Sequence, residues 1–406
     1  MPATVVLAFS GGLDTSYCVP RLKELGYRVH TLFVDTGGVT PQAVRGIERR
    51  AMELGAWRHT THDASDQLWD DFVVPFVMGG ECYQSQYPLL CSDRYAIAGA
   101  MAKLAIETSA DAVGHGCTAM GNDQIRFDNS LRCLTDLPVL APIRDLQNTT
   151  GEPRAYEIDY LESRGFCVPS DVKRYTINEN ILGATISGSE IDLYRSPEQG
   201  ARRLTAPIDT WPDTPTFATL RFEKGRCVAL DGQALSGKVM LRDLNRRFGE
   251  CGVGRGIYSG DTIIGLKGRI VFEAPGLTAL LTAHRALEEV SITKEQNTFK
   301  PVAARKWTEL MYSGFYYEPL RLDLERLIYS TQEHVTGTVT VEAFSACCCA
   351  VAIDAERPLQ LPDALYAQSA SWSADEAEGF IKILGNSTAT SALRQRSCAQ
   401  EDISVA

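Results

Sequence analysis

The sequence contains no long hydrophobic run. None of its 406 residues lies in a stretch approaching the roughly 18 to 20 continuous apolar residues that a membrane-spanning helix needs. The amino-terminal segment has one short apolar run that leads into a glycine turn, without the basic region and cleavage site of a secretory signal. We therefore expect a soluble, cytoplasmic protein with no membrane partner.

Positive charge is also scarce. The chain has 40 lysine and arginine residues against 51 aspartate and glutamate residues, a formal net charge of -11. Nucleic-acid-binding proteins normally carry a basic face that displaces counterions from the phosphate backbone. The acidic balance argues against a nucleic-acid partner and favours small-molecule substrates.

Paired C-x-x-C spacings are absent as well. The twelve cysteines are scattered, except that residues 347–349 are three adjacent cysteines in an apolar run whose alternate side chains would point to opposite sheet faces. Without the spacing of a zinc site or a disulfide framework, we expect reduced and mostly buried thiols. The sequence identifies no metal ligands.

The first part of the chain does contain an alternation of strand-like and helix-like segments. The pattern predicts buried strands over residues 4–9, 29–34 and 110–113, and helices over residues 14–25, 41–54 and 94–108. Such alternation is typical of an α/β fold, a parallel sheet covered by helices. Ligands of these sheets bind beyond the carboxyl ends of the strands, which is where two glycine turns occur.

The remainder of the chain has a different texture. A chain of 406 residues exceeds one compact core, so we expect more than one domain. Residues 183–213, rich in Gly, Ser, Thr and Pro, predict a long connection between units. Beyond it we expect an α+β unit with a hairpin over residues 217–222 and 227–230, helices over 277–290 and 318–333, and a strand over 336–343. A frayed tail is expected from Gly385 onward.

The first glycine turn is Ser10-Gly11-Gly12-Leu13-Asp14-Thr15-Ser16, between a predicted strand and a predicted helix. Glycines let the backbone approach an anion, and the helix start offers free N–H groups and the positive end of its dipole. The turn therefore predicts a phosphate site. It lacks the lysine of the G-x-x-x-x-G-K-[ST] loop, and its spacing instead resembles the pyrophosphate loop of enzymes that cleave ATP between the α and β phosphates.

The second glycine turn lies in residues 114–127, which read G-H-G-C-T-A-M-G-N-D-Q-I-R-F. Within nine consecutive residues, 118–126, the turn has a hydroxyl, two carboxamides, a carboxylate and a guanidinium. These are the groups needed to orient an amino acid and a neutral carbonyl group. A solvated loop rarely concentrates such groups. The alternative is a loop without function, in which His115 has only a structural role.

Together these segments resemble the argininosuccinate synthase family. The resemblance is carried by residues 8–16 and 121–127, with further matches at residues 87–89, 141–144, 222–225, 252–255, 273–276, 335–339 and 377–382. It implies an ATP-dependent, AMP-forming carbon–nitrogen ligase of arginine biosynthesis. In that family ATP, used with Mg²⁺, adenylates the ureido oxygen of citrulline, and the amino group of aspartate displaces AMP.

The resemblance also implies an organisation and a set of site residues. We expect a pyrophosphate-loop nucleotide-binding domain over residues 1–165, a synthetase domain over 166–370, and over 371–406 a partly disordered extension that helps to build a homotetramer. Asp14, Asn122, Asp123 and Arg126 are the implied catalytic residues. The implied ATP-binding residues are Ala8, Phe9, Ser10, Gly11, Gly12, Leu13, Asp14, Thr15, Ser16, Thr36 and Gly116. Those for aspartate are Thr118, Asn122 and Asp123, and those for the acceptor are Tyr87, Ser92, Asn122, Arg126, Thr176, Thr185 and Phe272.

The acceptor end departs from the family pattern. Family members have serines at the positions of Thr176 and Thr185, a glutamate near Gly260 and a tyrosine at Phe272, and these residues bind the amino-acid head of citrulline. Loss of a carboxylate that pairs with an ammonium costs roughly 1.5 to 3 kcal/mol for the charged hydrogen bond. Asp261 can replace it if the local alignment shifts by one residue.

Two further departures concern the nearby loops. The segment between Tyr87 and Arg94 is one residue shorter than in the family, which leaves the contact of Ser92 with citrulline open. A family lysine in the second turn is Met120 here, which removes a positive charge close to the nucleotide.

Four functional hypotheses remain. The first is a diverged but ordinary argininosuccinate synthase, and the second is a paralogue in secondary metabolism that joins aspartate to a different acceptor. The third is a tRNA-modifying enzyme, because thiolases and lysidine synthases have a similar pyrophosphate loop, although the acidic balance and missing C-x-x-C pairs argue against it. The fourth is a non-catalytic ATP-binding protein, suggested by Met120 and the altered acceptor end.

Overall fold

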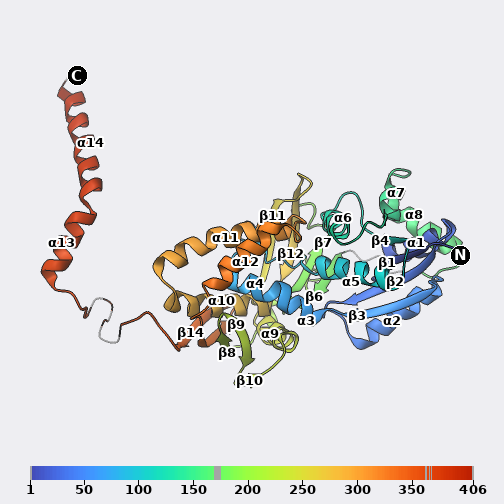
Figure 1. Cartoon of the computed structure of the whole chain (residues 1–406), viewed down its shortest axis with the longest axis horizontal. Helices are drawn as coiled ribbons and strands as arrows, with labels where there is room; N and C mark the ends of the chain where they lie inside the picture. Colours follow the sequence, from blue (N-terminus) through green and yellow to red (C-terminus); the bar gives the residue numbers. More distant parts are fainter. Residues whose placement is uncertain (1, 169–174, 362–363, 365, 367, 405–406) are drawn as a thin grey trace. The chain divides into compact units, whose positions relative to one another are not determined.

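A parallel five-stranded sheet forms the amino-terminal part of the protein (Figure 1). The computed structural model describes residues 2–168, 175–361, 364, 366 and 368–404. The strand order is β3-β2-β1-β4-β5, and the strands are β1 (Thr4–Ala8), β2 (Arg28–Asp35), β3 (Arg58–Asp63), β4 (Ala112–Gly114) and β5 (Val139–Leu140). Every residue of β1 is buried, as expected for a central strand with both faces covered.

Helices cover both faces of this sheet. On the face of Val5 and Leu7 the core is completed by α1 (Leu13–Glu24), α2 (Pro41–Glu53), α7 (Pro142–Gln147) and α8 (Pro153–Ser163). On the face of Val6 and Ala8 it is completed by α3 (Ser65–Leu68), α5 (Asp93–Glu107) and α6 (Asp123–Leu134). The expected α/β fold with a parallel sheet is therefore confirmed.

The order of the strands locates the ligand crevice. From β1 the chain runs to β2 and β3 on one side, and only later to β4 and β5 on the other. The direction of winding thus changes between β1 and β4, the point at which α/β sheets bind ligands beyond the carboxyl ends of their strands. The two glycine turns follow these two strands.

A second sheet is antiparallel and lies in the later part of the chain. Its order is β10-β9-β8-β13-β14, from β8 (Thr216–Glu223), β9 (Arg226–Leu230), β10 (Gln233–Ala234), β13 (Gly337–Phe344) and β14 (Cys347–Ala355). The inward residues of β8 and β13 pack with α9 (Gly237–Glu250) and α10 (Pro275–Ser291) in the same hydrophobic core that reaches the parallel sheet. The remaining elements of this core are η1 (Trp69–Val73), α4 (Val74–Gly79), α11 (Lys294–Tyr312) and α12 (Pro319–Ser330).

A third, four-stranded antiparallel sheet has the order β11-β12-β7-β6. Its strands are β6 (Thr176–Asn180), β7 (Gly183–Ser187), β11 (Arg255–Asp261) and β12 (Lys267–Glu273), and a short 3-10 turn, η2 (Ile208–Thr210), follows β7. The expectation of a long connection beginning at residue 183 is wrong in its first part, because residues 184–186 pair with β12. Ladder hydrogen bonds on both sides of β7 outweigh its glycine- and serine-rich composition.

Residues 358–406 form a separate unit. It contains α13 (Ala374–Leu384), which begins with a capping box between Ser373 and Glu376, and α14 (Asn386–Ser404). The expected frayed tail from Gly385 is therefore wrong for residues 386–404. The segment contains the helix-forming residues Ala, Leu, Arg and Gln, and these favour a helix despite the Ser and Thr residues between them.

Other elements show where the sequence patterns were sufficient. The predicted strands and helices of the first 114 residues all occur, with ends shifted by one or two residues, and so do the hairpin, both later helices and the later strand. The expectation of mostly buried thiols is wrong: of the eleven described cysteines, all free, only four are buried. Cys347 and Cys349 are exposed on one face of β14, while Cys348 between them points to the opposite face and is half-buried.

Candidate active site

The first glycine turn connects β1 to α1 and leaves the start of α1 open. Gly11 has a φ of +76°, a left-handed conformation that favours glycine, and the helix cap Gly12 has no capping side chain among the described residues. The turn is held by its own hydroxyls: Gly12 N donates to Ser10 Oγ (3.3 Å) and Ser10 N donates to Thr15 Oγ1 (3.3 Å). The N–H groups of the first turn of α1 can therefore bind a phosphate.

Two other implied ATP residues lie at the same edge of the sheet. Thr36 follows β2, and Gly116 follows β4, the two strands on either side of β1. A side chain at Gly116 would come within 3.0 Å of Thr15 Cγ2 and 3.3 Å of Thr15 N. Gly116 therefore packs closely against Thr15, so the second turn lies beside the first at the carboxyl edge of the sheet.

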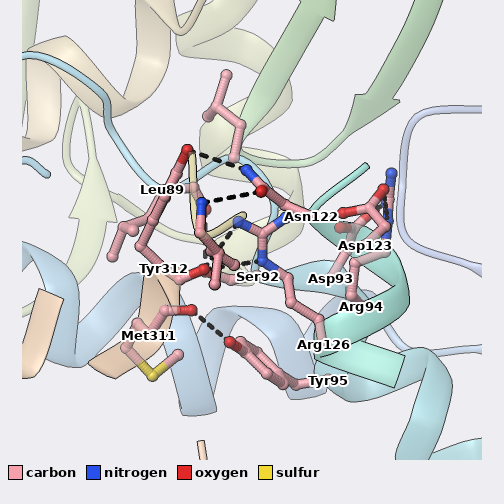
Figure 2. Close-up of polar contacts among 12 residues, drawn as sticks. Leu89, Ser92, Asp93, Arg94, Tyr95, Asn122, Asp123, Arg126, Met311 and Tyr312 are labelled. Atoms are coloured by element: carbon pink, nitrogen blue, oxygen red, sulfur yellow. Dashed lines mark hydrogen bonds and ion pairs between the residues drawn. The ribbon is translucent and has the colours of Figure 1, made fainter. Parts of the chain in front are cut away.

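Asp123 and two arginines form the charged centre of the second turn. Arg94 Nε donates to Asp123 Oδ2 (2.9 Å), and Arg126 Nη1 donates to Asp123 Oδ1 (2.7 Å). Figure 2 shows Arg126 between Asp123 and Tyr312. Burial alone would raise the pKa of Asp123, but the two guanidinium groups outweigh it and lower this pKa to about 2. Asp123 is thus a fixed carboxylate at neutral pH.

Arg126 is 3% exposed and is held by the end of α11. Its Nε and Nη2 both donate to the carbonyl oxygen of Tyr312 (3.1 and 2.8 Å), and its guanidinium lies 5.0 Å from the centre of the Tyr312 ring. Two of the five N–H donors of Arg126 thus bind the Tyr312 carbonyl and a third binds Asp123, so two remain for a substrate. The neighbouring Asn122 is similarly fixed: Nδ2 donates to Tyr312 Oη (3.1 Å), and Oδ1 accepts from Ile263 N (3.0 Å).

Aromatic side chains line the acceptor end. Tyr87 is buried and lies with ring centroids 6.0 Å from Phe272, 5.7 Å from Tyr258 and 6.0 Å from Tyr312. Phe272 on β12 pairs with Thr185 on β7, so two implied acceptor residues are adjacent. Thr176 lies two residues from the partner of Thr185 on β6, on the same face of the sheet, and contacts none of the other implied acceptor residues through a described hydrogen bond.

The position of the missing family glutamate is crowded by two side-chain ends. A Cβ at Gly260 would lie 2.4 Å from Tyr258 Oη and 2.5 Å from Gln84 Oε1, so a larger residue there would require these groups to move. Tyr258 Oη donates to Gln84 Oε1 (2.9 Å), and Gln84 Nε2 donates to Asp261 Oδ2 (3.2 Å). The carboxylate of Asp261 therefore lies next to Gly260, the position at which the family has a glutamate side chain.

The side chains of Ser92, His115 and Thr118 have hydrogen-bond contacts within the protein, whereas that of Met120 faces solvent. Ser92 is buried, and its hydroxyl donates to the Leu89 carbonyl (2.9 Å), which uses its one donor. His115 is buried, with Nε2 2.8 Å from Asp128 Oδ1. Thr118 Oγ1 accepts from Met120 N (3.3 Å), while the Met120 side chain is 69% exposed.

Several site residues could not be found from the sequence. Arg94, Tyr258 and Tyr312 come from three elements outside both glycine turns. Only the fold brings Arg94 to Asp123, Tyr312 to Asn122, and Tyr258 to Tyr87. Glu157 on α8 is another: it is 2% exposed, and its pKa responds to Asp14 of the first turn. No periodicity or motif distinguishes it from its neighbours on α8. Burial, followed by the charge and the hydrogen bond of Asp14, raises the pKa of Glu157 to about 8, and Arg154 offsets only part of this.

Comparison with known proteins decides the family. The Arginosuccinate synthase N-terminal HUP domain matches residues 4–167, and the Arginosuccinate synthase C-terminal domain matches residues 175–391. The chain belongs to the argininosuccinate synthase family. Proteins named argininosuccinate synthase are similar to it at 55% identity in Xanthomonas campestris pv. campestris (95% of this chain, 97% of that protein) and 53% in Xylella fastidiosa (95% and 96%). One from Bacillus pumilus is 36% identical (94% and 94%).

Membership of the argininosuccinate synthase family makes this chain an ATP-dependent, AMP-forming ligase. The hypotheses of a tRNA-modifying enzyme, of a non-catalytic ATP-binding protein and of a paralogue with another acceptor are not favoured by relatives of this identity. Among the described residues, no helix is long and apolar enough to cross a membrane.

Proposed function

We propose that the protein makes argininosuccinate: ATP adenylates the ureido oxygen of citrulline, and the amino group of L-aspartate displaces AMP. The observation that carries this proposal is the close packing of the two glycine turns, which places the open start of α1 beside the second turn with its fixed carboxylate, Asp123. Holding both reactants in line there can supply roughly 7 to 11 kcal/mol of the barrier. We propose that this positioning is the main catalytic contribution of the protein.

The proposed residue roles follow from the groups that are free to bind. The backbone N–H groups of the first turn of α1, from Leu13 to Thr15, bind the phosphates and stabilise the departing pyrophosphate through the dipole of α1. Asp123 retains lone pairs beyond its two arginine contacts and accepts from the ammonium of aspartate, with Thr118 nearby. The two free donors of Arg126 and the carboxamide of Asn122 hold the ureido group, which fixes its oxygen toward the α-phosphorus.

The proposed cofactor Mg²⁺ fits this site as part of the nucleotide complex. Among the described residues, no three His, Cys, Asp or Glu side chains are grouped to hold a metal. Mg²⁺ is commonly bound by substrate phosphates, waters and only one or two carboxylates, so a protein cage is not required. When bound with ATP it supplies neutralisation of the phosphate charge.

We propose that Gln84, Tyr258 and Asp261 replace the family residues that bind the head of citrulline. Tyr258 Oη also lies 3.2 Å from the Asp261 carbonyl, and that carbonyl accepts from Tyr312 Oη (3.3 Å), which connects the head end to Asn122. Asp261 offers a carboxylate to the α-ammonium, and its partner Lys267 can turn to the α-carboxylate. The charged groups of Asp261 and Lys267 are then close to the aromatic side chains that surround Tyr87.

Replacement of Tyr258 by Phe tests this head-group site. The substitution keeps the ring that covers Gly260 but removes the hydroxyl that orients Gln84 and Asp261, so we expect the KM for citrulline to rise about tenfold, the value of one hydrogen bond. The KM for ATP and kcat should change less than twofold. Steady-state kinetics with citrulline varied are the measurement, and Tyr366→Phe, on a fully exposed tyrosine, is the control. An unchanged KM for citrulline would remove Tyr258 from the acceptor site.

The proposed function itself is tested by product analysis. The purified protein with MgATP, L-aspartate and citrulline should release pyrophosphate and AMP in equal amounts with argininosuccinate, and omission of any substrate should stop both. Turnover with another ureido compound but not with citrulline would support the paralogue. ATP binding without AMP formation under any combination of substrates would support a non-catalytic protein.

We also propose a cytoplasmic homotetramer, on the basis of the family resemblance. In support, α13 exposes large apolar side chains, which soluble proteins normally bury in an interface; they are Phe380 (63% exposed), Ile381 (66%), Ile383 (79%) and Leu384 (68%). Sedimentation equilibrium of the full chain should give about four times the 44.5 kDa chain mass. A monomer at micromolar concentration would contradict this proposal.

A further inference from the structure

Two exposed thiols lie in contact at the start of β14. Cys347 and Cys349 are both exposed, and their Sγ atoms are 3.5 Å apart. Alternate side chains of a strand point to the same face, so this pair shares one face, whereas Cys348 points to the other and is half-buried. The contact belongs to the run of three cysteines, which neither the proposed ATP site nor the proposed acceptor site uses.

The backbone holds these two thiols together. β14 lies at the end of its sheet, where Cys347 pairs with Phe344 and Cys349 pairs with Glu342 on β13. Cys347 follows a two-residue hairpin turn, in which Ala346 has a left-handed φ of +64°. Turns of this length fix the register of the two strands that they join. The pairing and the turn therefore set the position of both cysteines, so their contact does not depend on the conformation of a long loop.

The spacing of the pair allows a disulfide. Two steps along a strand span roughly 6.4 to 6.8 Å, which lies at the upper end of the roughly 4.4 to 6.8 Å between the Cα atoms of bridged cysteines. The Sγ atoms have to move from 3.5 Å to the bonding distance of about 2.05 Å. Because the ring closes at the limit of the permitted spacing, its disulfide should be readily reduced.

Other uses of the pair fit less well. Among the described residues, no three His, Cys, Asp or Glu side chains are grouped to hold a metal, and a structural zinc needs four ligands. A lasting disulfide does not suit the proposed cytoplasmic location, where thiols are kept reduced and disulfides are normally transient. Reversible oxidation is the chemistry that two exposed thiols in contact can complete and a single thiol cannot.

We propose that Cys347 and Cys349 form a reversible dithiol site that reacts with low-molecular-weight disulfides. One thiolate of the pair attacks the small disulfide R–S–S–R, which forms a mixed disulfide and releases R–S⁻. The other thiol then loses its proton and attacks the protein sulfur of the mixed disulfide, which forms the bond between the two cysteines and releases the second R–S⁻. The protein loses two electrons and two protons, and the small disulfide takes up both to become two thiols, R–SH. An excess of a small thiol reverses the two steps.

The contact itself favours two separate steps. The hydrogen bond with Cys347, followed by the charge of Cys347 in its thiolate form, raises the pKa of Cys349, because two thiolates this close repel each other. The pair therefore presents one thiolate for the first attack and keeps the other sulfur protonated beside it. That second sulfur already lies next to the mixed disulfide when this forms, so ring closure should be faster than a second reaction with the reagent.

The experiment follows mass and not catalytic activity. The reduced full chain is incubated under native conditions with an excess of bis(2-hydroxyethyl) disulfide, quenched with acid, unfolded and alkylated with iodoacetamide. Mass spectrometry is then applied to the peptide that contains residues 347–349. In the wild type this peptide should lack two hydrogen atoms and carry one alkyl group, on Cys348. Dithiothreitol should restore all three thiols.

Serine variants locate the bond. Cys348→Ser should form the same bond and leave no thiol in this peptide to alkylate. Cys347→Ser and Cys349→Ser should each stop at the mixed disulfide and keep a 2-hydroxyethylthio group from the reagent. Cys133→Ser, on an exposed cysteine of α6, is the matched control and should leave the result at residues 347–349 unchanged.

Several results would overturn the inference, the first two on the wild type alone. Mixed disulfides that persist on both Cys347 and Cys349 would show that the two sulfurs do not reach bonding distance. Reaction only after unfolding would show that the thiols are not accessible in the native protein. A ring that still forms in Cys349→Ser would assign the oxidation to Cys348, and a disulfide between two chains would equally remove the proposed pair. None of these results bears on the proposed ligase activity.

Discussion

Replacement of Asp123 by Ala should lower kcat/KM for aspartate by roughly 10²- to 10³-fold, because removal of one member of a buried charge pair costs about 2 to 5 kcal/mol. Asp123 is the fixed carboxylate between Arg94 and Arg126, and it is the proposed acceptor for the ammonium of aspartate. Its loss also leaves the two guanidinium groups without their common partner. The proposed phosphate site on α1 is separate, so the Kd for ATP should change less than threefold.

Two further variants make this result specific. Asp123→Asn preserves the size of the side chain and one acceptor oxygen but not the charge, and it should lose nearly as much activity as Ala if the charge binds the ammonium. Asp136→Asn, on an exposed residue just beyond α6, is the matched control and should be silent. Steady-state kinetics with aspartate varied, together with ATP calorimetry, are the measurements. Activity within tenfold of wild type in Asp123→Ala would show that the second turn does not bind aspartate.

The two glycine turns could be predicted because their signal is local. Each lies directly after a buried strand. The residue types within residues 10–16 indicate a phosphate site, and those within residues 114–127 indicate a site for an amino acid and a carbonyl group. The parallel order of the strands then brings the turns together, since the carboxyl ends of β1 and β4 meet at one edge. Sequence patterns sufficed for this half of the site because short-range geometry and strand topology determine it.

The acceptor end could not be predicted in the same way. Tyr258 lies on a strand and Tyr312 at the end of a long helix that no pattern had indicated, and their approach to Tyr87 depends on packing between elements far apart in sequence. The strand β3, with its polar sequence Arg-His-Thr-Thr-His-Asp, was missed for a related reason. At the edge of the sheet its pairing with β2 determines its conformation, although its composition is polar.

The core of the later part of the chain contains a polar network that composition also did not reveal. Lys300 on α11 is 1% exposed, and its Nζ donates to both carboxylate oxygens of Glu288 on α10 (2.7 and 2.6 Å) and to the carbonyl of Met78 on α4. Gln332 Nε2 donates to Glu288 Oε1 (2.7 Å), and Gln332 Oε1 lies 2.9 Å from His284 Nε2. Burial lowers the pKa of His284 to about 4, so this ring is neutral and accepts or donates without adding charge. The network joins three helices and the segment after α12.

Replacement of Lys300 by Met should therefore lower the free energy of unfolding by about 3 to 5 kcal/mol, the usual cost of leaving one member of a buried ion pair alone. Burial by itself lowers the pKa of Lys300 and opposes the charged form, and contact with Glu288 offsets this, so each charge depends on the other. The control is Lys306→Met on the same helix, whose partner Glu309 is exposed and whose loss should cost less than 1 kcal/mol. Chemical denaturation of the two variants beside the wild type is the measurement.

The double variant Lys300→Met with Glu288→Leu separates the charge from the packing. If the cost of the single variant comes from an uncompensated carboxylate, removal of that carboxylate should restore a large part of the stability, because a well-packed apolar pair often equals a buried ion pair. Gln332 would lose its acceptor in the double variant, so recovery should be incomplete. Equal stability of the single and double variants would show that lost packing of the long Lys300 side chain, and not the unpaired charge of Glu288, determines the effect.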